Sequence, residues 1–210
     1  MTNGINREMD VRVRALEDVL LDQGAIDDTT VADYAHKVAD EWLPTRGALL
    51  CAKAWCDDDF KAFLLSDGKA AAASLGFAMP EHHGSLVVKE NTDEIHNVIC
   101  CSLCSCTAFT IIGLAPGWYK ELEYRARIVR EARAVLGEMG LTLPESMKIR
   151  IWDTTADTRY MVLPARPQNT ENWTEEQLAN LITQDDLIGV ARLDRRPVES
   201  SASSASAPLV

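Results

Sequence analysis

Apolar residues near the start of the chain recur at helical spacing between charged residues. Residues 8–22 fit one amphipathic helix, and Gly24 ends the pattern. A second helix is expected over 31–42, before Pro44, and a third over about 46–56. These segments carry little core of their own. We therefore expect either an arm that is stabilised by wrapping a partner or a loosely packed helical subdomain.

The pattern changes to that of a mixed helical and stranded domain after residue 56. A helix is expected over 57–75, where the acidic run Asp57–Asp59 complements the helix dipole and is not expected to bind a metal. Further helices are expected over 118–139, which is rich in arginine, and near 174–184. Short apolar or alternating runs predict strands over 86–89, 97–100, 148–152, 159–163 and 187–191.

Two of these strands, 148–152 and 159–163, are expected to pair as a hairpin because only a short turn separates them. Residues 195–210 are rich in serine and are expected to form a flexible tail. The predicted fold class is therefore α+β. A helical N-terminal segment over 1–56 precedes a layered α/β domain over 57–194.

Composition and charge are those of an ordinary globular protein, and they argue against two kinds of partner. The 210 residues are 47% hydrophobic and 25% charged, with a net charge of −11. Nucleic acid requires basic patches, and no apolar run is long enough to span a membrane. The N-terminus lacks the apolar core of a signal peptide, so we expect a cytoplasmic protein without a disulfide framework.

The most unusual feature of the sequence is a run that holds four of the six cysteines, from Cys100 to Cys106. Closely packed thiolates repel one another and oxidise easily unless a metal holds them. Cys100 is expected to end the preceding strand as a buried side chain. The spacing of Cys101, Cys104 and Cys106 differs from that of common zinc sites, which use two separated pairs of ligands.

Cys104, Ser105 and Cys106 can chelate a metal in an unusual way. The two sulfurs and the amide nitrogens of Ser105 and Cys106 form a planar set of four ligands with small chelate rings. Cys101 can bind on one side of this plane, which leaves an open position for substrate or water on the other. An amide nitrogen binds only after losing its proton, so the ion must be strongly Lewis-acidic and trivalent. We call residues 101–106 the claw loop.

The claw loop and its surroundings resemble the α subunit of nitrile hydratase. The likeness extends over roughly residues 10–193, and the stretches that carry it are Ala54–Lys61, Val88–Thr92, Val98–Thr107, Gly113–Lys120, Glu123–Arg127 and Asp153–Pro164. The resemblance implies a lyase that hydrates small nitriles to amides. It also implies a β subunit as partner, in an αβ or α2β2 assembly, with the N-terminal arm wrapped around that partner.

The resemblance further implies roles for individual residues. The sulfurs of Cys101, Cys104 and Cys106 and the amides of Ser105 and Cys106 would hold one metal in each αβ unit. Cys104 would be oxidised to a sulfinate and Cys106 to a sulfenate. Cys106 and Ser105 are the candidate catalytic residues, because water or the sulfenate oxygen attacks the nitrile carbon. The oxidised sulfurs need cations, which the family takes from β-subunit arginines. Within this chain, Arg159 is the candidate for supporting the partner interface or the surroundings of the metal ligands, and a structural salt bridge is the alternative.

The residues that follow the first and last ligands indicate the metal. Cobalt members of the family tend to carry threonine and tyrosine at these positions, whereas Ser102 and Thr107 follow the pattern associated with iron. We therefore expect low-spin Fe(III), with Co(III) as the runner-up.

One stretch departs from the family pattern. Many members carry a glutamine near the metal site, upstream of the claw loop, where this chain has Pro80–Gly84. His82 and His83 in this stretch are either solvated side chains of a surface turn or hydrogen-bonding neighbours of the metal ligands.

Two other functions stay open at this point. Thiocyanate hydrolase contains a related subunit with the same kind of claw, usually with cobalt, and Ser102 and Thr107 argue against it. The non-enzymatic alternative is a structural zinc or redox-sensing module. Equimolar zinc and unoxidised cysteines would support that alternative.

Overall fold

The computed structural model describes residues 3–104 and 106–195, which form two compact units that divide after Glu41. Helix α3 (Thr45–Cys56) belongs to the second unit, because Leu50, Cys51 and Ala52 on this helix have no solvent exposure. The boundary therefore lies before α3, and not after residue 56 as the sequence pattern suggested. None of the described helices is both long enough and apolar enough to cross a membrane.

The described side chains of the N-terminal unit form no core of their own. It consists of α1 (Asn3–Asp22), α2 (Asp28–His36) and a π-helical turn (Lys37–Glu41). Among its described side chains, at 7–27 and 29–41, none is buried. The apolar side chains that α1 leaves largely exposed are Met9, Val11, Val13, Leu16 and Val19.

The strands of the second unit form two parallel pairs. β1 (Ser85–Glu90) pairs with β4 (Thr158–Leu163), and β2 (Ile95–Cys100) pairs with β3 (Lys148–Asp153). The hairpin predicted for β3 and β4 is therefore wrong, because the turn between them carries the chain from one sheet to the other. An alternating pattern reports which face of a strand is buried, and it does not report which strand is the neighbour.

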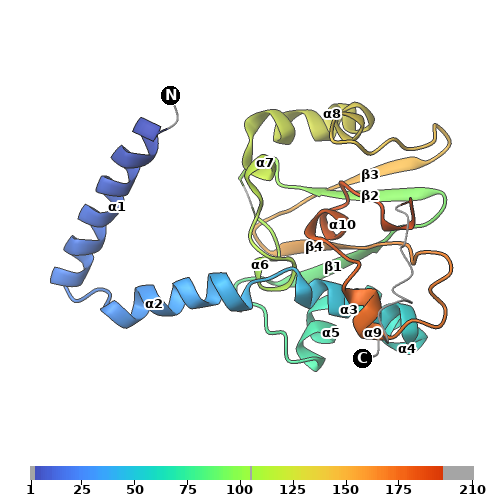
Figure 1. The fold of residues 1–210 in the computed structure, drawn as a ribbon, viewed down its shortest axis with the longest axis horizontal. Helices are drawn as coiled ribbons and strands as arrows, with labels where there is room; N and C mark the ends of the chain where they lie inside the picture. Colours follow the sequence, from blue (N-terminus) through green and yellow to red (C-terminus); the bar gives the residue numbers. More distant parts are fainter. Residues whose placement is uncertain (1–2, 105, 196–210) are drawn as a thin grey trace, which may run out of the picture. The chain divides into compact units, whose positions relative to one another are not determined.

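Helices enclose the strands on both sides, as the predicted fold class requires (Figure 1). α8 (Leu122–Glu138) contacts β2 and β3, while α4 (Asp58–Ser66) and α5 (Gly68–Ser74) contact β1. The core lies between these layers and includes Leu64, Ile99, Ile111, Ile128, Leu136, Met161 and Leu163. The remaining elements are α6 (Phe109–Ile112), α7 (Gly117–Lys120), α9 (Glu175–Ala179), α10 (Gln184–Ile188) and a 3-10 turn (Leu193–Arg195).

Three predicted elements differ in detail. The helix expected over 57–75 is broken at Asp67, whose carboxylate accepts a hydrogen bond from the Ala70 amide and begins α5. The helix expected over 118–139 is divided between α7 and α8. The strand expected over 187–191 is wrong. Leu187 and Ile188 belong to α10, because a short apolar run fits a buried helix as well as a strand.

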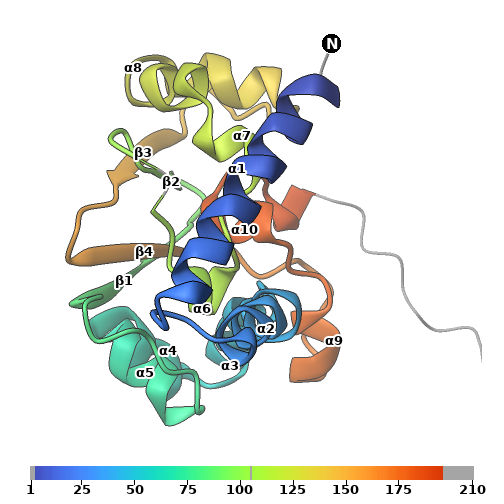
Figure 2. The same cartoon turned by 90° about the vertical axis from the view of Figure 1, so that its left-hand side faces the viewer.

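α10 packs against β2 at a position that requires glycine. Gly189 ends the helix with a φ of +93°, and a Cβ placed there would lie 2.1 Å from the Asn97 carbonyl oxygen. The Gly189 carbonyl also lies 2.7 Å from the Nε2 of His96, a buried side chain of β2. This close contact fixes the strand that leads into the claw loop. Figure 2 shows α10 from a second direction.

Candidate metal centre

The claw loop leaves the sheet where two parallel strands end. β2 ends at Cys100, which is paired in register with Asp153, the last residue of β3. The carboxyl ends of parallel strands meet at one edge, the usual place for a site in such sheets. Cys100 has no solvent exposure, and burial, reinforced by the negative charge of Asp153, raises its pKa to about 12. Cys100 is therefore a neutral buried thiol, as the sequence pattern predicted.

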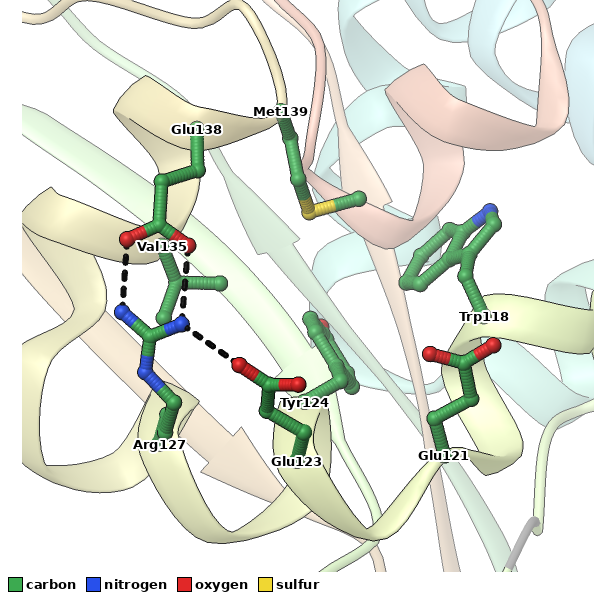
Figure 3. A pocket seen from close by; sticks show the side chains of 8 residues that line it. All are labelled: Trp118, Glu121, Glu123, Tyr124, Arg127, Val135, Glu138 and Met139. Atoms are coloured by element: carbon green, nitrogen blue, oxygen red, sulfur yellow. Dashed lines mark hydrogen bonds and ion pairs between the residues drawn. The ribbon is translucent and has the colours of Figure 1, made fainter.

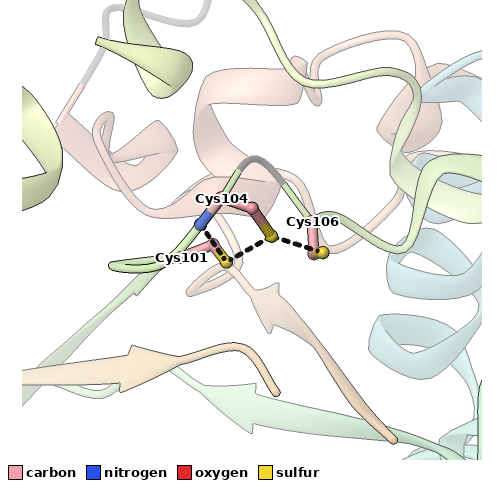
Figure 4. Close-up of side chains that lie close together, drawn as sticks. All are labelled: Cys101, Cys104 and Cys106. Atoms are coloured by element: carbon pink, nitrogen blue, oxygen red, sulfur yellow. Dashed lines mark hydrogen bonds between the residues drawn. The ribbon is translucent and has the colours of Figure 1, made fainter. Parts of the chain in front are cut away.

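Three sulfurs converge in the claw loop (Figure 4). The Sγ atoms of Cys101 and Cys104 are 3.2 Å apart, those of Cys104 and Cys106 are 2.8 Å apart, and none forms a disulfide. With metal–sulfur bonds of about 2.3 Å, two sulfurs at adjacent octahedral positions lie about 3.3 Å apart. Across the described parts of the chain, this is the one group of three potential ligand side chains whose atoms converge. The sulfurs fit a single ion.

Of the two residues whose amides are predicted to bind the metal, the structure describes Cys106 but not Ser105. Ser105 lies outside the described residues, so its amide ligation and its catalytic role stay predictions. The amide of Cys104 is 3.4 Å from the sulfur of Cys101, which shows how tightly the chain turns after the first ligand. The oxidation of Cys104 and Cys106 stays a prediction as well.

The thiol of Cys106 needs a metal in order to ionise at neutral pH. Burial raises its pKa to about 12, and the hydrogen bond with the Cys104 thiol and the negative potential of Cys101 and Cys104 act in the same direction. The positive charge of Arg159 opposes them. A metal that binds the Cys106 sulfur must therefore displace its proton, so metal retention should weaken as the pH falls.

Side chains from three elements hold the base of the claw loop. Asp153 at the end of β3 accepts hydrogen bonds from the Ser102 amide, at 2.9 Å, and from the Ser102 hydroxyl. Arg125 on α8 donates to the carbonyl oxygens of Cys101 and Ser102 at 3.2 and 3.0 Å. Tyr119 on α7 donates its hydroxyl to the Cys106 carbonyl at 3.2 Å. By contrast, the tip is open: Cys104 is exposed, and Leu103 is 86% exposed.

These three anchors were not singled out from the sequence. The hairpin prediction separated Asp153 from β2, whereas the parallel register places it opposite Cys100. The sequence signal that could have identified Asp153 is its position as a polar residue at the end of a predicted strand. Arg125 lies in the stretch Glu123–Arg127 that carries the family resemblance, but the sequence does not distinguish it there from Arg127.

A pocket of about 270 Å³ opens beside Cys106 and brings the remaining predicted site residues together. The residues that line it are His82, His83, Cys106, Thr107, Phe109, Leu114, Ala115, Lys120 and Arg159. Arg159 is buried, and it donates to the backbone carbonyls of Thr155 and Ala156 rather than to a carboxylate. Its charge therefore remains available to the pocket.

The two histidines of the pocket have different environments. His82 is exposed, as the surface-turn interpretation expects, but His83 is 1% exposed and packs edge-to-face on Phe109. Burial, the positive charge of Arg159 and the neighbouring side chains of His82 and Lys69 lower the pKa of His83 to about 4, so its ring is neutral at physiological pH. Within the described residues its Nδ1 atom has no hydrogen-bond partner, which leaves that atom available to a bound molecule.

Comparison with known proteins identifies the family. The family model described as nitrile hydratase, alpha chain, matches residues 7–191. The chain belongs to this family. A nitrile hydratase α subunit from a Rhodococcus species is 49% identical over 184 residues, which cover 87% of this chain and 92% of the relative. The resemblance inferred from the motifs is therefore confirmed.

Nitrile hydratases of both metal types are similar to this chain. The structure of a double mutant of the Fe-type nitrile hydratase from Comamonas testosteroni Ni1 is 62% identical, with a TM-score of 0.88, and covers 98% of this chain and 97% of that one. The low-molecular-weight cobalt-containing α subunit from Rhodococcus rhodochrous is 45% identical over 186 residues, 89% of each chain. The chain is thus the α subunit of a metal-dependent nitrile hydratase.

The thiocyanate hydrolase alternative receives less support. The γ subunit of thiocyanate hydrolase from Thiobacillus thioparus is 40% identical over 194 residues, which cover 88% of this chain and 77% of that subunit. The two nitrile hydratase α subunits described above exceed this identity, at 49% and 45%. A free-standing zinc or redox-sensing module has no support from these comparisons.

Proposed function

We propose that this chain is the α subunit of an iron-type nitrile hydratase, which adds water to a small nitrile and releases the amide. The observation that carries the proposal is the convergence of the Cys101, Cys104 and Cys106 sulfurs at the carboxyl edge of β2, in a nitrile hydratase α chain. Amide ligation by Ser105 and Cys106 completes the proposed site.

Iron is supported by the residues next to the ligands. Ser102 and Thr107 follow the iron pattern, and the Fe-type relative is 62% identical whereas the cobalt-containing relative is 45% identical. Thr107 is buried, and its hydroxyl donates to the Gly113 carbonyl at 3.3 Å.

The chain supplies the surroundings of the reaction. The metal, when bound, would offer an open position and the positive charge that polarises a nitrile triple bond. Phe109, Leu114 and Ala115 give the pocket an apolar wall that suits the organic part of a small nitrile. We assign attack on the nitrile carbon to a water or to the sulfenate oxygen of Cys106, and the charge of Arg159 favours an anionic oxygen there.

A β subunit is the proposed partner. None of the described side chains of the N-terminal unit is buried. Helix α1 exposes a set of apolar residues that a partner would cover. Leu103 is exposed at the tip of the claw loop, which marks that surface as another candidate contact. We propose that the partner closes the pocket and supplies further cations to oxidised Cys104 and Cys106. We also propose that the complex is cytoplasmic.

The test is to produce the chain together with its β subunit and to analyse the metal, the cysteines and the activity. The tryptic peptide from Glu90 to Lys120 contains the whole claw loop. We expect iron, two added oxygens on Cys104, one on Cys106, and amide formed from a nitrile. A Cys56→Ala complex is the matched control, because Cys56 is exposed and far from the loop in sequence.

Three outcomes would count against the proposal. Fully reduced cysteines with equimolar zinc would favour a plain thiolate site. Cobalt in active enzyme would overturn the iron assignment and leave the nitrile hydratase assignment in place. Hydrolysis of thiocyanate without hydration of nitriles would favour the thiocyanate hydrolase activity.

A further inference from the structure

The arginines of α8 differ in what they contact. Arg127 is surrounded by carboxylates, with Glu123, Glu131 and Glu138 at 2.6–3.0 Å. Figure 3 shows its contacts with Glu123 and Glu138. Arg130 donates to a carbonyl of its own helix. Arg133 holds a neighbouring segment through the carbonyls of Leu143, Pro144 and Met147. Only Arg125 among these four reaches the claw loop.

Arg125 binds the claw loop through two nitrogen atoms of its guanidinium group. Nε donates to the Cys101 carbonyl at 3.2 Å, and one terminal nitrogen donates to the Ser102 carbonyl at 3.0 Å. The planar fork of arginine suits such a pair of acceptors, and an ammonium group cannot reproduce it. In the described part of the chain, no carboxylate lies within ion-pair distance of Arg125. Its positive charge is therefore not cancelled by a neighbouring side chain.

Ser102 is held from both sides as a result. Asp153 accepts from its amide, and Arg125 donates to its carbonyl, so both peptide groups of Ser102 are fixed. Ser102 directly follows the first sulfur ligand. Rotation about the backbone bonds of Ser102 would change the position of Cys104. The hydrogen bonds with Asp153 and Arg125 therefore support the convergence of the sulfurs.

The corner between α7 and α8 presents Arg125 rigidly. Trp118 and Tyr124 pack edge-to-face with ring centroids 4.9 Å apart, and both line a pocket of about 230 Å³ on this corner (Figure 3). Tyr124 is buried, and its hydroxyl donates to the Ile99 carbonyl of β2 at 3.1 Å. The neighbouring Arg125 is thus tied to the strand from which the claw loop leaves.

The charge of Arg125 matters because the occupied claw is an anion. Three thiolates and two deprotonated amides around a trivalent ion leave a net negative charge, in a loop whose first ligand is buried. A cation at the base of the loop lowers the energy of that anion more than that of the protonated, metal-free loop. It should therefore slow the loss of metal.

We propose that Arg125 is a positioning residue of the metal centre: its fork fixes the turn after Cys101, and its charge stabilises the anionic claw. The inference rests on the proposed function in that it assumes a trivalent ion on the claw loop. It assigns to this chain a cation at the base of the loop, in addition to Arg159 beside Cys106 and to any cation that the partner supplies.

The test compares purified αβ complexes that contain the wild-type chain, Arg125→Gln, Arg125→Lys or Arg133→Gln. Glutamine keeps a hydrogen-bond donor and removes the charge, whereas lysine keeps the charge and loses the fork. Arg133 is the matched control, because it also donates to backbone carbonyls from α8 but contacts a segment remote from the loop. Each complex, produced with iron, is treated with EDTA. Metal content, the sulfur-to-metal absorption band and the thermal midpoint are then followed.

We expect Arg125→Gln to release metal at least about tenfold faster than the wild type and to shift the absorption band. Arg125→Lys should recover part of this loss and release metal more slowly than Arg125→Gln. Arg133→Gln should lower the thermal midpoint and release metal at the wild-type rate. If Arg125→Gln does not assemble, Arg125→Lys is compared with Arg133→Lys, and faster release from Arg125→Lys is the expected result.

The proposal is overturned if Arg125→Gln keeps the wild-type release rate and band, or if Arg133→Gln loses metal equally fast. Equal release from Arg125→Lys and Arg125→Gln would overturn the role of the charge. Failure of the proposed function has a different signature: a wild-type complex that binds metal but forms no amide. The ratios of metal release would still decide the role of Arg125 in that case. A wild-type complex without metal in the loop overturns both.

Discussion

The claw loop and the acidic run Asp57–Asp59 both place metal-ligand side chains close together in the sequence, but only the claw loop brings its ligand atoms together. In the acidic run, the Asp57 carboxylate accepts from the Phe60 amide at 2.9 Å and lies 3.6 Å from the Lys53 ammonium. Asp58 and Asp59 are exposed in the first turn of α4, as the capping interpretation predicted.

The difference lies in the backbone that carries each cluster. On a helix, consecutive side chains point in directions about 100° apart, and the first carboxylate is used by the amides of its own turn. The claw loop leaves a parallel strand pair and is held by Asp153, Arg125 and Tyr119 at its base. Its sulfurs are therefore free to face one another. A cluster of ligand residues becomes a site when the backbone is anchored from outside the cluster.

The largest effect that separates the two clusters should come from Cys104. Cys104→Ala removes the sulfur that lies between the other two, so we expect loss of bound metal and a fall in nitrile hydration of at least about a hundredfold. Asp58→Ala, in the acidic run, should leave metal content and hydration within about twofold of the wild type. Metal analysis and an amide-formation assay on the αβ complexes give both numbers. Retained activity in Cys104→Ala would remove the claw assignment.

The second prediction tests whether an anchor outside the cluster is required. Asp153→Asn keeps the shape of the side chain but weakens its acceptance of two hydrogen bonds from Ser102. We expect metal to be released about ten to a hundred times faster, with the fold retained. Asp58→Asn is the matched control for removing one carboxylate. Equal release rates from the two variants would show that Ser102 needs no charged anchor.

The sequence predicted the ligand sulfurs better than it predicted their supports. Cys101, Cys104 and Cys106 are close in the chain, so their convergence follows from local geometry alone. Asp153 reaches the loop through a parallel pairing, and Arg125 through the packing of α8 on β2 and β3. These are long-range contacts that periodicity does not report, and the expected hairpin excluded the first of them. The separation of His82 from buried His83 likewise depends on tertiary packing.

The third prediction concerns His82 and His83, a polar pair in which one member is buried and the other exposed. His83→Ala removes a buried ring from its contact with Phe109, so we expect unfolding to become easier by about 2 kcal/mol. His82→Ala should change the free energy of unfolding by less than about 0.5 kcal/mol. Urea unfolding of the complexes measures both values. Equal effects would show that the burial of His83 does not persist in solution.

The smallest expected effect belongs to the acidic run itself. Asp57→Ala removes the N-cap of α4, so we expect a slightly lower free energy of unfolding at pH 7, with no change in metal content. The hydrogen bond from the Phe60 amide and the charge of Lys53 lower the pKa of Asp57 in the folded chain. Stabilisation by this carboxylate is therefore present above its unfolded pKa, near 4, and is lost as the pH falls through the folded value.

The pH dependence makes this prediction specific to the cap. Wild type and Asp57→Ala should differ most at neutral pH, and the difference should shrink below about pH 4 because protonated Asp57 is a weaker acceptor. Asp59→Ala, which removes an exposed carboxylate from the same turn, is the control for the helix dipole alone. If metal content fell in Asp57→Ala but not in Asp59→Ala, the acidic run would have to be reassigned from the structure of α4 to the metal centre.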